Sequence, residues 1–145
     1  MQKTISVLLI SCIVALTSFS IEDLGKEVLQ STNEFRKSNG LEKLKPNEVL
    51  TRIAQQHSQN MANGKVNFGH SGFRNRNTSA AKQIPGLAYF AENVACGPTT
   101  GKDVVNLWKK SQNHRENMLG NYNIIGIGIA KSKDGTYYYT QIFGN

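Results

Sequence analysis

Near its C-terminus the chain alternates between large and small residues, and this alternation limits the choice of fold more than any other feature. The large residues are Ile125, Ile127 and Ile129, and the small ones between and after them are Gly126, Gly128 and Ala130. A period of two predicts a β-strand, and glycines along one of its faces allow another element to approach closely. Lys133–Gly135 is typical of a turn, and residues 136–143 form a second β-branched and aromatic stretch. The sequence therefore predicts an antiparallel hairpin with one crowded face.

The segments before this hairpin carry apolar residues at the spacing of amphipathic helices. The predicted helices cover residues 22–38, 48–62, about 101–111, and 113 to about 120. Asn47 and Asn113 are the candidate N-caps of the second and the fourth helix. Helices followed by an antiparallel hairpin favour an α+β layered fold. The length of the chain predicts one domain, residues 21–145.

Residues 67–86 lack a hydrophobic period and are rich in glycine, serine, asparagine and arginine. This composition predicts a long surface loop, and loops of that length usually carry function or move. Three basic residues in it, Arg74, Arg76 and Lys82, are interpreted as a solvated face of the loop. We therefore expect a functional site at this segment, without assigning it to these basic residues.

The first twenty residues, 1–20, have the layout of a secretory signal peptide. Lys3 supplies a positive start, residues 5–16 are predominantly apolar, and Ser18 and Ser20 are small residues at −3 and −1 of a cleavage site. A membrane anchor is the rival interpretation, but the apolar run is shorter than the roughly 18 residues that a span needs. The protein is therefore expected to be secreted or to reside in the periplasm or cell envelope.

The two cysteines of the chain fall in different parts of this layout. Cys12 belongs to the signal, and Leu9–Cys12 also resembles the cleavage box of a bacterial lipoprotein, which is a further alternative. Removal of the signal leaves Cys96 alone, so no internal disulfide is expected despite export. Cys96 could be a nucleophile or a metal ligand, but a small buried apolar residue beside Gly97 is the favoured interpretation.

The chain is basic, with 17 lysines and arginines against 10 aspartates and glutamates and a net charge of +7. Such a charge favours contact with anionic surfaces, such as envelope polymers or lipid headgroups. Nucleic acid would suit the charge as well, but export and the lack of a basic stripe with interleaved aromatics speak against it. An anionic envelope surface is thus an expected partner, and nucleic acid is not.

The candidate chemistry centres on a histidine and a carboxylate. His70 lies at the mouth of the predicted loop in Phe68–Gly72, and Glu92 lies in the apolar stretch Phe90–Val94. An ionised carboxylate in such a setting is costly unless it is paired or hydrogen-bonded, so Glu92 is expected to have a partner. Meeting across a cleft, the two residues could act as acid and base or ligate a divalent metal. The alternative is an exposed His70 and a Glu92 that caps backbone N–H groups.

The other two histidines receive different interpretations. His57 has apolar neighbours on one face of the second helix and is interpreted as a core histidine with one hydrogen bond. His114 follows Asn113, and its side chain could point to a cleft or to solvent. Trp108 shares a helix face with Val104 and is expected in the core.

Five short motifs occur in order along the chain. They are Phe68–Gly72, Ala91–Gly97, Trp108 with Ser111–Leu119, Ile125–Gly128 and Tyr139–Gly144. Together they resemble the bacterial branch of the CAP superfamily, which includes cysteine-rich secretory proteins, antigen 5 and plant pathogenesis-related proteins. The resemblance implies a three-layer α-β-α sandwich, with an antiparallel sheet between helical layers and a large open cleft.

The resemblance also implies which residues line that cleft. Eukaryotic members line it with two histidines and two glutamates, and His70 and Glu92 match the first of each kind. Lys109–Ser111 replaces the segment of the second glutamate, Tyr138 stands where the second histidine is found, and His114 could supply the missing imidazole. The implied ligand site is therefore His70, Glu92, His114 and Tyr138. The implied metal site, with zinc as the candidate ion, is His70, Glu92 and His114.

Two hypotheses for the function follow from this resemblance. Members of the superfamily resemble binding modules for sterols, fatty acids, glycans or protein partners, and protease and other hydrolase activities have been proposed for some. The first is an exported domain that binds a small apolar (lipid or sterol-like) or glycan-like ligand, or a partner, in a cleft lined by His70 and Glu92. The second is a hydrolase in which these two residues activate water, with or without a metal. The first is favoured because no nucleophile is placed: Ser71 adjoins His70 but lacks the setting of a nucleophile elbow.

Overall fold

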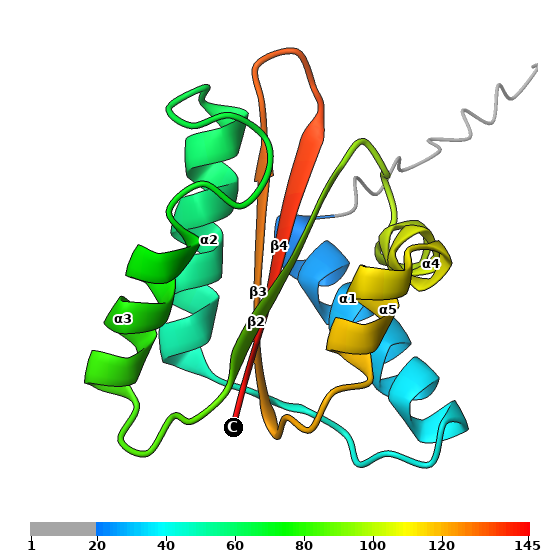
Figure 1. Ribbon diagram of the computed structural model, residues 1–145. Helices are drawn as coiled ribbons and strands as arrows, with labels where there is room; N and C mark the ends of the chain where they lie inside the picture. Colours follow the sequence, from blue (N-terminus) through cyan, green and yellow to red (C-terminus); the bar gives the residue numbers. More distant parts are fainter. Residues whose placement is uncertain (1–19) are drawn as a thin grey trace, which may run out of the picture.

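The computed structural model describes residues 20–145, and in it helices cover both faces of a four-stranded sheet (Figure 1). The helices are α1 (Ile21–Ser38), α2 (Glu48–Ala62), α3 (Phe73–Gln83), α4 (Gly101–Lys110) and α5 (Gln112–Met118). The strands are β1 (Lys45–Pro46), β2 (Phe90–Cys96), β3 (Ile124–Lys131) and β4 (Tyr137–Gly144). The expected α+β fold, an α-β-α sandwich of three layers, is therefore confirmed. The predicted signal peptide, residues 1–20, lies outside the described residues except for Ser20.

The strands of the sheet lie in the order β1-β3-β4-β2. The predicted C-terminal hairpin is formed by β3 and β4, which run antiparallel with Ile129 opposite Tyr139. β2 joins the other side of β4, also antiparallel, with Glu92 opposite Ile142. β1 adds only two residues and pairs parallel to β3, so the sheet is antiparallel except at this short strand. This order places β2, with Glu92, at the opposite edge of the sheet.

One face of the sheet is covered by α2 and α3, and the glycines of β3 decide how closely α2 packs there (Figure 1). A Cβ atom on Gly128 would lie 2.2 Å from the carbonyl carbon of Ala54 in α2. A Cβ atom on Gly126 would lie 2.1 Å from the carbonyl carbon of Leu50. Because both contacts are with helix backbone, a larger residue would have to displace α2. The predicted close approach of another element to this strand is confirmed.

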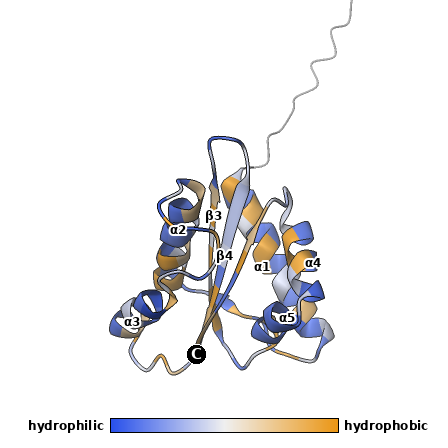
Figure 2. Ribbon diagram, turned by 45° about the horizontal axis from the view of Figure 1, so that its top comes forward, coloured by the Kyte–Doolittle hydropathy of each residue, from blue (hydrophilic) through white to orange (hydrophobic). Residues whose placement is uncertain are grey.

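The opposite face is covered by α1, α4 and α5, which enclose the larger apolar core. Trp108, Tyr139 and Phe143 are fully buried there. The indole Nε1–H of Trp108 donates to the carbonyl of Val94 at 3.0 Å, which fixes the ring against β2. The predicted core position of Trp108 is thus confirmed. Figure 2 shows apolar stretches on α1 and α4, whereas α3 and α5 are mostly hydrophilic.

The prediction of a loop over residues 67–86 is wrong, because this segment contains α3. Ala80 is the buried residue of this helix, so its sequence has no apolar stripe by which a helix could be recognised. The helix begins after Gly72, whose positive φ of 80° suits a residue without a Cβ atom. Within the part of the chain that the structure describes, no helix is both long enough and apolar enough to cross a membrane.

The N-caps of two helices and the burial of Cys96 were also predicted from the sequence. Asn47 is the N-cap of α2, as predicted, and its side chain accepts the N–H of Leu50 at 3.1 Å. The N-cap of α5 is Ser111 and not Asn113, which lies inside the helix and therefore presents its side chain from the first turn. Cys96 is half-buried at the end of β2 and not fully buried as predicted, because it lies at the last residue of an edge strand.

Candidate functional site

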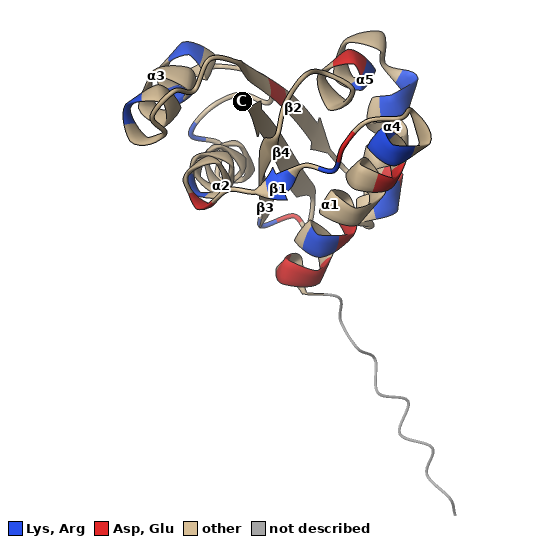
Figure 3. Cartoon of the chain, turned by 90° about the horizontal axis from the view of Figure 1, so that it is seen from below, with Lys and Arg blue, Asp and Glu red and all other residues tan. Residues whose placement is uncertain are grey.

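An open pocket of about 690 Å³ lies along the edge strand β2, with the start of α3 on one side and α5 on the other. Figure 3 shows this arrangement from below, where β2 lies between the two helices. The polar lining comes from His70, Glu92, Ser111, Asn113, His114 and Asn117. The apolar lining comes from Phe73, Phe90, Ala91 and Tyr122. The pocket therefore combines hydrogen-bonding groups with aromatic rings.

Glu92 is the centre of the polar lining, and its side chain is fully buried. The Nε–H of Arg76 donates to one carboxylate oxygen at 2.6 Å, and the Nη2–H donates to the other at 2.7 Å. His70 contributes a third hydrogen bond, with Nδ1 at 2.9 Å from Oε1. Both oxygens of Glu92 are therefore occupied, and the expectation that this carboxylate has a partner is confirmed.

The contact with Glu92 also fixes the tautomer of His70. An ionised carboxylate only accepts hydrogen bonds, so Nδ1 of His70 must carry the proton. In the neutral ring Nε2 is then an acceptor on the side away from Glu92. The side chain of His70 is 48% exposed, so this acceptor is accessible from the pocket.

Arg76 was interpreted from the sequence as part of a solvated basic loop, and that interpretation is wrong. Its side chain is only 12% exposed, because α3 turns it toward β2 and Glu92. The guanidinium also donates to the carbonyl of Ser71 at 2.7 Å and to that of His70 at 3.4 Å. One signal could have identified it: a buried Glu92 needs a cation, and Arg76 is one of few basic residues near His70 in the sequence.

His57 lies on α2, on the buried side of Glu92. It is 2% exposed, and its Nε2–H donates to the carbonyl of Gly69 at 2.8 Å. Burial lowers the pKa of His57 below the ordinary histidine value, so the neutral form is favoured. The interpretation as a core histidine with one hydrogen bond is confirmed. The sequence did not indicate that its Nε2 would lie 4.0 Å from a carboxylate oxygen of Glu92.

On the other side of the pocket, α5 is tied to β2 by asparagine side chains. The Nδ2 group of Asn117 donates to the backbone carbonyl of Glu92 at 3.2 Å and to Oδ1 of Asn93 at 2.9 Å. Asn93 in turn donates to the backbone carbonyl of His114 at 3.1 Å. The bond to the carbonyl of Glu92 thereby occupies one backbone acceptor of an edge strand, and the two bonds of the Asn93 side chain hold α5 against β2.

The predicted site residues are only partly brought together. His70, Glu92 and His114 line the same pocket. Burial, and to a smaller extent the neighbouring His70, lowers the pKa of His114. Tyr138 lines a different pocket, between the C-terminal end of α2 and the β3–β4 turn. The centroid of its ring lies 6.4 Å from that of Phe68. Tyr138 lies four positions along β4 from Ile142, the partner of Glu92, which corresponds to about 13 Å.

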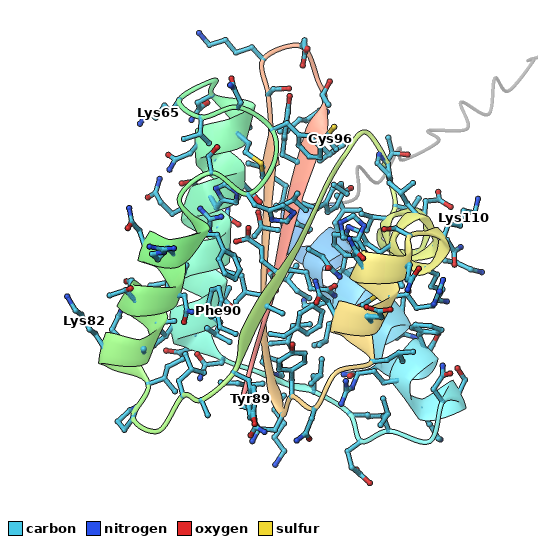
Figure 4. The ribbon with its side chains drawn as sticks, in the orientation of Figure 1. Lys65, Lys82, Tyr89, Phe90, Cys96 and Lys110 are labelled. Atoms are coloured by element: carbon cyan, nitrogen blue, oxygen red, sulfur yellow. The ribbon has the colours of Figure 1, made fainter. Side chains whose placement is uncertain are left out.

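The side chains of His70, Glu92 and His114 do not fit a zinc site in this arrangement. Within residues 20–145 no three histidine, cysteine, aspartate or glutamate side chains are grouped so that they could share a metal ion. The oxygens of Glu92 already accept hydrogen bonds from Arg76 and His70. What the site can do is offer His70 Nε2 and asparagine amides beside aromatic rings, of which Phe90, labelled in Figure 4, packs edge-on against Phe73.

Comparisons with known proteins agree with the fold and with the motifs. The model of the CAP family, described as the cysteine-rich secretory protein family, matches residues 29–143. The uncharacterized protein YkwD of Bacillus subtilis is 32% identical over 128 residues, which cover 86% of this chain and 49% of YkwD. The membrane protein YlbC of the same organism is 29% identical over 122 residues, covering 81% of this chain and 33% of YlbC. The chain thus spans half or less of the length of these curated relatives.

Solved structures show the same fold. A cysteine-rich secretory protein of Staphylococcus aureus superposes with a TM-score of 0.69 at 26% identity, covering 85% of this chain and 38% of that one. An outer surface protein of Borrelia burgdorferi has a TM-score of 0.69 at 22% identity and covers 83% and 90%. An extracellular SCP-domain protein of Bacillus anthracis has a TM-score of 0.70 at 21% identity and covers 88% and 44%. By sequence and by fold, this chain belongs to the CAP family of cysteine-rich secretory proteins.

Proposed function

We propose that this protein is an exported CAP domain that binds a glycan-like ligand in the pocket lined by His70, Glu92 and His114. The observation that carries the proposal is the composition of this pocket, in which oriented polar groups and aromatic rings lie along one strand edge. Sugars present hydroxyl groups to such donors and acceptors, and their C–H faces suit aromatic surfaces. The accessible Nε2 of His70 is an acceptor suited to a hydroxyl donor.

A glycan-like ligand is favoured over an apolar one because of the polar side of this pocket. A lipid or sterol-like molecule would leave His70 Nε2, Asn113 and Ser111 without hydrogen-bond partners, and that loss costs free energy. The net charge of +7, of which only Lys3 lies in the signal segment, suits an anionic envelope surface, which would keep the domain close to polymeric glycans. Similarity to an outer surface protein and to an extracellular protein supports export.

Calorimetric titration with soluble N-acetylglucosamine oligosaccharides and peptidoglycan fragments tests the proposal. We expect saturable binding to the wild-type protein, a loss of about tenfold or more in His70→Ala, and no change in Lys110→Ala, because Lys110 is exposed at the end of α4. Binding of fatty acids or sterols with no glycan binding would refute the glycan assignment. Equal glycan affinity in the wild type and His70→Ala would show that the ligand does not bind in this pocket.

Export is tested by sequencing the N-terminus of the protein recovered outside the cytoplasm. Cleavage after Ser20 would give a chain that starts at Ile21. The structure adds an argument for cleavage further upstream, because Ser20 caps α1 in a reciprocal capping box with Asp23. A lipid-modified start at Cys12 would retain this cap and identify a lipoprotein. A protein found only inside the cell with residues 1–20 intact would refute export.

A hydrolase is the second candidate, and one geometric observation favours it. The bond between His70 Nδ1 and Glu92 is the arrangement in which a carboxylate orients a histidine base. The Nε2 atom could then take a proton from a water molecule that attacks a bound ligand. Hydrolysis of a peptide, ester or glycan that disappears in both His70→Ala and Glu92→Gln, measured at a temperature at which both variants are folded, would establish this activity.

A further inference from the structure

We infer that Arg76 is the permanent cation of this pocket, that it keeps divalent metals away from Glu92, and that it positions His70. This inference concerns the pocket of the proposed function, but it rests on the contacts of Arg76 and not on the identity of the ligand. Arg76 is thus a positioning residue that acts through Glu92 and the adjoining loop.

The first step is the charge of Glu92. Its side chain is fully buried, and a buried carboxylate is stable as an ion only with a close cation or several hydrogen bonds. Arg76 provides both, through two hydrogen bonds of 2.6 and 2.7 Å to the two oxygens. Such a bidentate contact is among the strongest that arginine forms with a carboxylate. Among residues 20–145, no other lysine or arginine pairs with Glu92.

The second step is the loop that carries His70. Three consecutive carbonyls of this loop accept hydrogen bonds from the layer behind it. The carbonyl of Gly69 accepts from His57, and those of His70 and Ser71 accept from Arg76. The backbone of His70 is therefore held by the same guanidinium that neutralises Glu92, while its ring is held by Glu92 itself. The position and the tautomer of His70 both depend on Arg76.

The third step concerns the metal. A zinc ion at Glu92 would have to displace the guanidinium from one of the two oxygens, and repulsion between the two cations opposes this. Coordination by Nδ1 of His70 would also require this atom to lose its proton. Removal of Arg76 would leave Glu92 uncompensated between His70 and His57, whose Nε2 lies 4.0 Å away. The Arg76→Ala protein should therefore bind zinc more tightly than the wild-type protein does.

Two measurements without any glycan test this inference, so their failure is distinguishable from failure of the proposed function. The first is calorimetric titration with zinc chloride on the wild type, Arg76→Ala, Arg76→Lys and the double variant Arg76→Ala/His70→Ala. We expect Arg76→Ala to bind zinc about tenfold or more tightly than the wild type, through a carboxylate and a histidine that become available. This gain should be absent in Arg76→Lys, which keeps a cation, and in the double variant. Tight zinc binding by the wild type that is lost in both His70→Ala and Glu92→Gln would overturn the inference.

The second measurement is a long-range ¹H–¹⁵N NMR spectrum of the histidine rings, which reports the tautomer. In the wild type we expect His70 to be protonated at Nδ1. This tautomer should be partly retained in Arg76→Lys and lost in Arg76→Ala. Because the first observation uses the wild-type protein, it stays decisive even where Arg76→Ala folds poorly. A wild-type His70 that is protonated at Nε2, or a His70 whose tautomer and mobility are identical in all three proteins, would contradict the positioning by Arg76.

Discussion

The two helical layers of this sandwich differ in how they are held to the sheet. The layer of α1, α4 and α5 encloses thirteen buried hydrophobic residues, whereas the layer of α2 and α3 shares a cluster of four, Leu50, Ala54, Ala80 and Ile142. The second layer compensates with close backbone contact at the glycines of β3 and with buried polar bonds. One of these joins Ser58 to Thr140 at 2.8 Å, and another joins Arg76 to Glu92.

This difference indicates a division of tasks between the layers. Apolar burial contributes most of the stability of a fold, so the first layer should dominate the free energy of unfolding. Buried polar groups stabilise less, but they hold side chains in defined orientations. The pocket lies between the layers, and it takes its oriented groups from the polar layer and from α5. The following predictions test this division, from the largest expected effect to the smallest.

Trp108→Ala is expected to have the largest effect, because this residue is fully buried in the larger core. Truncation should lower the free energy of unfolding by about 3–5 kcal/mol, the range for large aromatic residues in cores. It also leaves the carbonyl of Val94 without its indole donor. Urea titration measures the effect. A loss below about 1 kcal/mol would mean that the first layer does not dominate stability.

Glu92→Gln should destabilise the polar layer by about 1.5–3 kcal/mol, because the hydrogen bonds it weakens involve a charged donor. Hydrogen exchange should increase mainly in α3, since Arg76 loses its anion. Glu34→Gln is the matched control, because Glu34 lies on the exposed side of α1, and it should change stability by no more than about 0.5 kcal/mol. An equal increase of hydrogen exchange in both layers of Glu92→Gln would show that the layers do not unfold separately.

Gly128→Ala tests the close approach of α2 to the sheet. The added Cβ would lie 2.2 Å from the backbone of Ala54, so the helix must move, with an expected cost of about 1–3 kcal/mol. Gly25→Ala in α1 is the matched control, because nothing lies within 4 Å of its added Cβ. Alanine has the higher helix propensity, so this control should gain about 0.5–1 kcal/mol. Urea titration measures the free energy of unfolding of both variants. A change of the same sign in Gly128→Ala and Gly25→Ala would contradict the packing described for α2.

His57, which lies in the layer of α2 and α3, should make the free energy of unfolding depend on pH. Burial lowers its pKa in the folded protein, so the unfolded chain binds a proton at a higher pH than the folded one. Its contribution to stability is complete above the unfolded pKa of about 6.5 and is lost as the pH falls through the folded pKa. The slope for one proton is at most about 1.4 kcal/mol per pH unit.

Urea titrations at several pH values between 5 and 8 measure this dependence. His57→Gln keeps a donor for the carbonyl of Gly69 but does not titrate, so its stability should fall less steeply at acidic pH than that of the wild type. Parallel pH profiles for the two proteins would exclude His57 as the titrating group. His114, whose pKa is also lowered, should contribute to the slope that remains.

Local pattern in the sequence was sufficient for most of the fold. The alternation in β3 predicts the hairpin, and the apolar stripes predict α1, α2 and α4, because burial imposes a period on each element. The same reasoning places Trp108 and His57 in the interior and requires a partner for Glu92. Each of these conclusions depends on neighbours close in sequence or on the solvation of a single group, and such information is present in the sequence.

The tertiary structure alone decided which residues meet. α3 buries Ala80 and is joined to β2 by the ion pair of Arg76 with Glu92, sixteen residues away, and neither contact gives its sequence an apolar stripe. Tyr138 and His114 were both candidates, but strand register places Tyr138 in another pocket while α5 places His114 beside His70. An ion pair of this kind has no sequence period. Its partners are fixed by the packing of whole layers, which only the folded chain defines.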